Sequence, residues 1–164
     1  ASPLRDVYKR QFLGYSMTAH RMPRLKVAVQ SVKRLRGKLK AQFRAGRGRA
    51  IDATIKDLAP ILRGWTAYFK LADVKGTFEE MDGWVHRKLR ATLWRQWTKP
   101  AARARNLMQR GIKKERAWIS ASNGRGPWWN ARTSHMHEAL PNAYFTKIGL
   151  ISFLKEHRRL YYAS

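Results

Sequence analysis

The sequence has 164 residues, and its 35 Lys and Arg against 10 Asp and Glu give a formal net charge of +25. Such an excess favours nucleic acid as a partner over a membrane surface, because cations that neutralise phosphates gain free energy from released counterions. An apolar content of 44% with seven Trp excludes a disordered chain, and the lack of Cys excludes disulfides and thiolate metal sites.

Residues 1–11 have the features of a sequencing artefact. Read back into DNA, the segment from Asp6 to Gln11 resembles the transposase end sequence that is used to prepare sequencing libraries. We therefore predict that residues 1–11 are translated adapter, that the natural sequence begins near Phe12, and that the chain is a fragment of a longer protein. A native basic N-terminal arm is the alternative.

The next segments predict one strand and one basic helix. Residues 12–17 are aromatic and β-prone, and because a lone strand is unstable in water we expect its partners upstream. Between residues 25 and 44, apolar residues recur at steps of three and four, which predicts a helix with one buried face. They are Leu25, Ala28, Val32, Leu35, Leu39 and Phe43. No acidic residue occurs between Phe12 and Ile51, so the other faces favour an anionic ligand.

Three further helices are predicted in the middle of the chain. One covers about residues 51–58, and Pro60 is placed at the first position of the next, which extends to residue 71. A long helix is predicted from Thr77, where Glu80 completes a capping box, to Trp97. The acidic residues at its start are interpreted as partners of the helix dipole. These residues are Glu79, Glu80 and Asp82.

The C-terminal part predicts short helices. They cover residues 101–110, residues 113–120, a segment with Pro141 near its start and Gly149 at its end, and residues 151–161. Between Asp82 and Glu115 the sequence again has no acidic residue, which makes this the second basic stretch of one sign.

The sequence offers little catalytic chemistry. His135 and His137 are two residues apart, which places them on different faces of a helix, and no neighbouring residues complete a metal-ligand spacing. Glu79 and Asp82 could pair, but acidic residues in a first turn more often interact with the helix dipole. The sequence therefore predicts neither a metal site nor a complete active site, and no cofactor for this chain.

Four segments, in order, resemble the C-terminal part of group II intron maturases. Residues 12–15, Phe-Leu-Gly-Tyr, are similar to the last block of the reverse transcriptase palm. Residues 62–73 resemble the thumb: they contain the motifs Leu-Arg-Gly-Trp, Tyr-Phe and Ala-Asp in the family's order. Residues 78–100 resemble the centre of the maturase-specific domain, and residues 142–150 resemble the closing block.

This resemblance implies a mainly α fold with one leftover β-strand from a missing palm. The implied domains are a palm remnant at residues 12–22, thumb helices at residues 23–72, and a maturase-specific domain with C-terminal helices at residues 73–164. The parent protein would be an RNA-directed DNA polymerase that uses Mg²⁺. This chain contains no Tyr-Ala-Asp-Asp motif, which supplies the metal-binding carboxylates of such a polymerase, so we expect it to be inactive alone.

The implied partners are group II intron RNA, which the protein would bind for splicing, and an RNA/DNA template-primer duplex. Neither a membrane nor a small-molecule substrate is expected as a partner, and the expected location is the bacterial cytoplasm, in a ribonucleoprotein. An A-form duplex is recognised mainly by its shape and phosphates, so the cations of both basic stretches are the candidate contacts. They are Lys33, Arg34, Arg36, Lys38, Lys40, Arg87, Lys88, Arg90 and Arg95.

Alternatives exist for several of these interpretations. Arg63 and Arg90 could be structural instead. Four tryptophans could stack on bases, but their helical spacing favours packing in a core. They are Trp65, Trp84, Trp94 and Trp97. As a whole, the chain could instead be a DNA-binding module, since long basic helices fit a major groove, or a ribosomal-protein-like scaffold that orders only on RNA.

Overall fold

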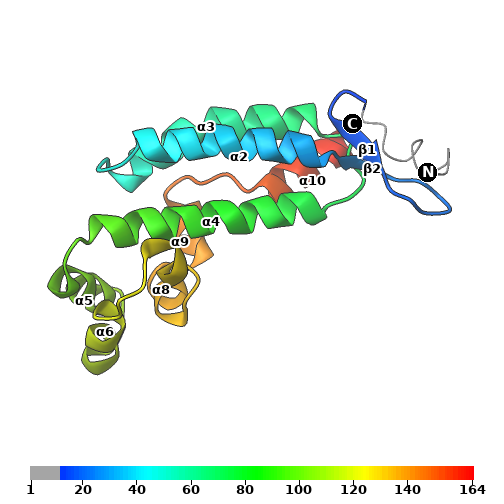
Figure 1. Ribbon diagram of the computed structural model, residues 1–164. Helices are drawn as coiled ribbons and strands as arrows, with labels where there is room; N and C mark the ends of the chain where they lie inside the picture. Colours follow the sequence, from blue (N-terminus) through cyan, green and yellow to red (C-terminus); the bar gives the residue numbers. More distant parts are fainter. Residues whose placement is uncertain (1–11) are drawn as a thin grey trace. The chain divides into compact units, whose positions relative to one another are not determined.

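The computed structural model describes residues 12–164, and the predicted adapter at residues 1–11 lies outside the described residues (Figure 1). The protein is mainly helical, as the sequence predicts. The chain divides into two compact units that are each built from separated segments. Among the described residues, the first unit takes in residues 12–42, Asp57–Asp82 and Ile151–Ser164, and the second takes in Phe43–Lys56 and Gly83–Leu150.

A small antiparallel sheet opens the first unit. Strand β1 (Tyr15–Met17) pairs with β2 (Leu25–Val27), with Tyr15 opposite Val27. The prediction that β1 has its partner upstream was therefore wrong, as was the inclusion of Leu25 in a helix. The backbone N–H of Leu25 donates to Asp73 Oδ2 at 3.0 Å, so a residue far along the chain fixes this segment as a strand.

Gly14 permits the close packing of the turn before β1. Its φ is +82°, and a Cβ at this position would lie 2.8 Å from Ser31 Oγ and 3.1 Å from the ring of Phe69. Any larger residue would both strain the backbone and clash with these two side chains. The Gly14 carbonyl in turn accepts hydrogen bonds from Ser31 Oγ and from the Ala28 N–H. The sheet is thereby attached to the helix that follows.

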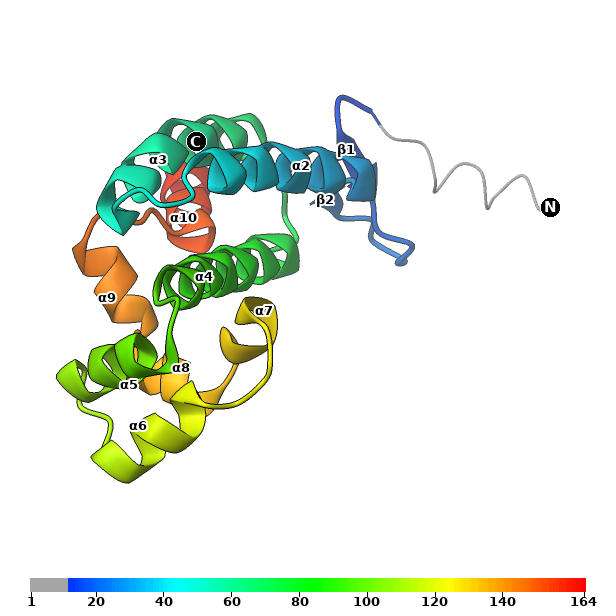
Figure 2. The same ribbon diagram turned by 60° about the vertical axis from the view of Figure 1, so that its left-hand side comes forward.

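Helix α2 (Val29–Ala45) runs beside α3 (Ile51–Tyr68) in both views of the molecule (Figures 1 and 2). The predicted apolar face is confirmed, since Leu35 and Leu39 are buried. Residues 51–68 form one helix, so the prediction that Pro60 begins a new one was wrong. Proline lacks the N–H that an interior helical position uses, but buried side chains on both sides of it hold the helix together. These side chains are Ile55, Leu58 and Leu62.

Helix α4 comprises Gly76–Gln96, and the last helix of the chain, α10, comprises Phe153–Ala163. Glu79 lies in the first turn of α4, as expected for a partner of the helix dipole, whereas Glu80 and Asp82 have hydrogen-bond partners that the sequence did not indicate. Glu80 accepts a hydrogen bond from Arg36 at 2.8 Å. Asp82 accepts hydrogen bonds from the N–H groups of Phe153 and Leu154, so it caps the N-terminus of α10.

The second unit contains most of α4 and five shorter helices. They are α5 (Pro100–Gln109), α6 (Lys114–Ala121), α7 (Pro127–Asn130), α8 (Ser134–Ala139) and α9 (Asn142–Lys147). Helices α5 and α6 pack together as a hairpin (Figure 2). Helices α5, α6 and α9 were predicted to within a few residues, whereas α7 and α8 were not predicted. Within residues 12–164, no helix is long and apolar enough to cross a membrane.

Candidate nucleic-acid interface

The outer face of α2 is a row of exposed cations. We call Lys33, Arg34, Lys38 and Lys40 the α2 cations; all four are exposed. Leu35 and Leu39 point into the core, and this fixes the direction in which the α2 cations project. Helix α2 has no acidic residue of its own. An anionic ligand could therefore approach this face without meeting a carboxylate from the same helix.

Arg36 differs from its neighbours on α2. It is half-buried, and its Nη2 lies 2.8 Å from Glu80 Oε1 in an ion pair. Part of its charge is already balanced within the protein. Arg36 was predicted as a phosphate contact together with the exposed cations, and its geometry favours a role in joining α2 to α4.

Arg87 and Lys88 on α4 are held by aromatic rings. Two donors of Arg87, Nε and Nη2, reach the Trp128 carbonyl at 3.0 and 2.8 Å, and its guanidinium lies 3.7 Å from the centroid of the Trp128 ring. Burial lowers the pKa of Arg87, and nearby Arg132 lowers it further. Lys88 lies 5.0 Å from the same ring and 5.4 Å from that of Trp84. These contacts fix both cations on the second unit and leave them half-buried.

Arg90 is a structural residue. Only 2% of its surface is exposed, and its guanidinium donates to the Leu140 carbonyl at 2.8 Å and to Asn142 Oδ1 at 2.7 Å. Burial lowers the pKa of Arg90, as expected for a cation that is removed from water. Of the two roles that the sequence left open, this geometry favours the structural one. Arg63, by contrast, is exposed.

Arg95 lines a cavity that the sequence did not reveal. The cavity has a volume of about 370 Å³ and lies between the loop after α2 and the end of α4. Arg47 and Thr92 line it together with Arg95. Gln96 Nε2 donates to the Arg49 carbonyl at 2.8 Å and so ties the loop to α4. Two guanidinium groups beside a hydroxyl are suited to bind a phosphate.

Arg47 was missed because its loop was interpreted only as the end of a helix. The available signal was the alternation of Arg and Gly at residues 46–49, which keeps cations in a tight loop. The position of this loop against α4 depends on contacts between residues far apart in the sequence. We find no local pattern that predicts it.

The histidines and tryptophans differ in burial, and Trp118, Trp128 and Trp129 are exposed. His135 Nε2 is 3.0 Å from Asn130 Oδ1 and 2.9 Å from Thr133 Oγ1, so it belongs to a hydrogen-bonded network of the second unit. Among residues 12–164, no group of three His, Asp or Glu could hold a metal ion. Trp94 and Trp97 are buried, which confirms core packing for these two, whereas Trp65 and Trp84 remain half-buried.

The sequence matches one family model and no curated protein. Residues 32–111 match the model of the group II intron maturase-specific domain. No curated protein sequence gives a significant match. The matched range contains residues 62–73 and 78–100, two of the four segments on which the resemblance was based. It also extends across position 73, so the predicted border between thumb and maturase-specific domain stays a prediction.

The matched range therefore unites several features described above. It contains most of α2, all of α3 and α4, and the cavity beside Arg47 and Arg95. The maturase-specific domain acts in group II intron splicing, and its partner is group II intron RNA. Residues 32–111 are therefore assigned to the group II intron maturase-specific domain, consistent with the C-terminal part of a maturase.

Proposed function

We propose that this chain binds group II intron RNA directly, through the α2 cations and the cavity formed by Arg47 and Arg95. In a longer protein with a polymerase domain, the same helices would also hold the RNA/DNA template-primer duplex. The exposed face of α2 carries the proposal: four cations project from one helix that has no acidic residue. A face of one sign loses repulsive energy when phosphates approach it.

The dimensions of α2 suit an A-form duplex. A helix of 17 residues is about 25 Å long, which allows its cations to meet several phosphates along a groove. A-form duplexes present a wide, shallow minor groove that proteins recognise by shape and phosphate contacts. Arg87 and Lys88 should contribute less to RNA binding, because both side chains already contact the ring of Trp128.

The test removes two of the α2 cations. The double variant Lys33→Gln/Lys40→Gln should bind a structured intron RNA more weakly, and its plot of log affinity against log salt should flatten by about one for each lost phosphate contact. Folding should persist, since exposed charges of one sign add little stability. Fluorescence anisotropy over a salt series measures the slope, and a thermal melt measures folding.

The matched control is Lys113→Gln/Lys114→Gln, which removes the same charge from two exposed residues at the start of α6. The control should retain the salt slope of the unmodified chain. If both double variants change the slope equally, binding depends only on total charge and the α2 face is not the interface. Tighter binding to duplex DNA than to intron RNA at matched salt would favour the DNA-binding alternative.

A further inference from the structure

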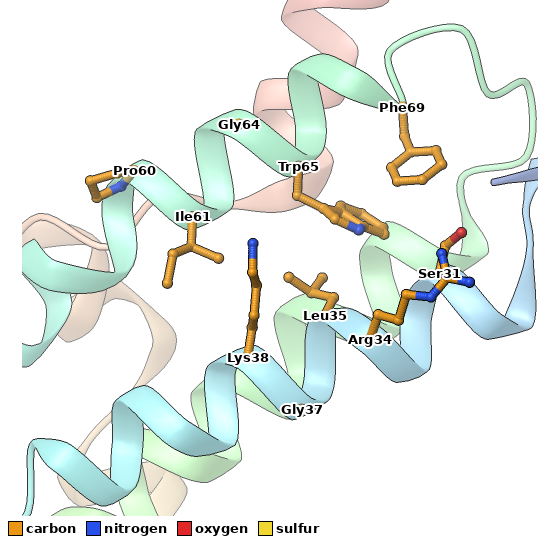
Figure 3. A pocket seen from close by; sticks show the side chains of 10 residues that line it. All are labelled: Ser31, Arg34, Leu35, Gly37, Lys38, Pro60, Ile61, Gly64, Trp65 and Phe69. Carbon is orange, nitrogen blue, oxygen red and sulfur yellow. The ribbon is translucent and has the colours of Figure 1, made fainter. Parts of the chain in front are cut away.

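A groove separates α2 from α3 in the first unit (Figure 3). It has a volume of about 700 Å³. Leu35 and Ile61 contribute apolar surface from the two helices, and Trp65 extends into the space between them (Figure 3). Arg34 and Lys38 project from α2 at the same groove (Figure 3). An aromatic and aliphatic lining thus lies directly beside two cations.

Two glycines keep the groove open. Gly37 on α2 and Gly64 on α3 both line it, and a Cβ at either position would meet no atom within 4 Å. Neither has a positive φ, so neither is required by the backbone. Glycine weakens a helix interior relative to alanine. Glycine at these two positions therefore lowers the stability of the helices, and it leaves space in the groove.

Trp65 is held in a fixed position at this groove. Its ring centroid lies 5.7 Å from that of Phe78, 5.6 Å from that of Phe153 and 4.8 Å from that of Phe69. These contacts anchor the indole from the core side, while the side chain as a whole stays half-buried. A ring that is rigid and partly accessible is a suitable surface for stacking a planar ligand, because little side-chain entropy is lost on binding.

The charges at the groove define the ligand further. The ten residues that line it include Arg34 and Lys38 but no acidic residue, so the occupant should carry negative charge. A second copy of this chain, with a net charge of +25, would be repelled. A nucleotide combines a planar base for the indole with a phosphate for the two cations.

We propose that the groove between α2 and α3 receives one unpaired nucleotide of the bound RNA, with its base against Trp65 and its phosphate near Arg34 and Lys38. This inference rests on the proposed function, since the RNA must first bind the α2 face. It adds a site that recognises an unpaired base to a surface that otherwise recognises only the shape and charge of a duplex.

The test compares three RNA hairpins on the full chain. One is fully paired, one carries a single bulged 2-aminopurine, and one carries a bulged abasic nucleotide that bends the duplex without offering a base. The bulged base should improve affinity about tenfold over the abasic bulge, within the range of base stacking on an aromatic side chain. The 2-aminopurine fluorescence should fall on binding, because stacking quenches it.

Replacing Trp65 would disturb the aromatic core, so the groove is better blocked from its open wall. Gly64→Leu should remove the preference for the bulged base and leave binding of the fully paired hairpin unchanged. Gly83→Leu is the matched control, since Gly83 is also an exposed helical glycine whose Cβ would meet nothing within 4 Å, and it does not line the groove. The control should retain the preference.

Different outcomes separate this inference from the proposed function. Equal affinity for the two bulged hairpins, or a preference that survives Gly64→Leu, would overturn the nucleotide site while salt-dependent duplex binding stands. The groove would then be left for an acidic protein segment. If none of the three hairpins binds, the proposed function itself fails.

Discussion

Helices α2 and α4 both carry many cations, but their surroundings give these cations different roles. The α2 cations project from one exposed face. On α4, Arg90 is buried against Leu140, and Arg87 is fixed on Trp128 by hydrogen bonds and ring contact. A basic stretch without acidic residues therefore indicates a ligand surface only where the fold leaves the cations in solvent. The partners of Arg87, Lys88 and Arg90 on α4 are carbonyls, aromatic rings and the Asn142 side chain of the same unit.

The largest expected effect comes from removing the buried cation of α4. Arg90→Ala should lower the free energy of unfolding by about 2 to 4 kcal/mol, because it leaves a cavity and removes hydrogen bonds from the Leu140 carbonyl and Asn142. Arg34→Ala, at an exposed position of α2, should change it by less than about 0.5 kcal/mol. Urea denaturation of both variants measures the difference. Similar losses in the two variants would contradict the contrast between the helices.

Acidification should destabilise the buried part of the first unit. His157 is fully buried, its Nε2 is 2.9 Å from the Ala72 carbonyl, and its Nδ1 has no hydrogen-bond partner. Burial lowers the pKa of His157, and Lys75 lowers it further, although the Ala72 carbonyl acts in the opposite direction. The folded state thus resists protonation while the unfolded state accepts it near pH 6.5.

The sign of the pH effect follows from this difference. Below about pH 6.5 the unfolded state binds more protons than the folded state, so stability falls as pH decreases, with a slope of up to about 1.4 kcal/mol per pH unit for this histidine. His135 and His137, whose pKa values are also lowered by burial, should act in the same direction. Thermal melts between pH 7.5 and pH 5 measure the effect. A His157→Gln variant with an unchanged pH dependence would show that this residue does not contribute.

Two cations of α4 can also be compared with each other, since Arg95 is exposed and Arg90 is buried. The double variant Arg47→Gln/Arg95→Gln should keep its melting temperature and bind intron RNA several-fold more weakly, because each lost phosphate contact reduces affinity. Arg103→Gln/Arg105→Gln, on α5, removes equal charge and does not line the cavity. Equal weakening in both would argue against a specific phosphate site.

Local sequence patterns predicted the long helices well because their information lies within a few residues. Leu35 and Leu39 are buried as the periodicity of three and four requires. Predictions failed where the deciding partner is distant. Asp73 accepts a hydrogen bond from Leu25 and fixes it in a strand, and the Leu140 carbonyl accepts a hydrogen bond from the buried Arg90. Neither contact can be inferred from neighbouring residues. Pro60 shows the reverse, since a local rule was overridden by buried side chains on both sides of it.

The candidate site was predicted in part for the same reason. The α2 cations follow directly from helical geometry once the buried face is known. The cavity with Arg47 depends on a loop that Gln96 ties to α4, and the groove at Trp65 depends on how two helices are spaced. Such features arise from packing between elements. They become visible only in the folded structure.

The most direct test of the account is the salt dependence of RNA affinity for the intact chain. If the four α2 cations engage phosphates together, log affinity should fall with log salt with a slope of about −3.5 or steeper on a duplex-containing intron RNA. Anisotropy titrations between about 50 and 300 mM NaCl give this slope. A slope between 0 and −1 would contradict the claim that the exposed cations of α2 form the RNA-binding surface.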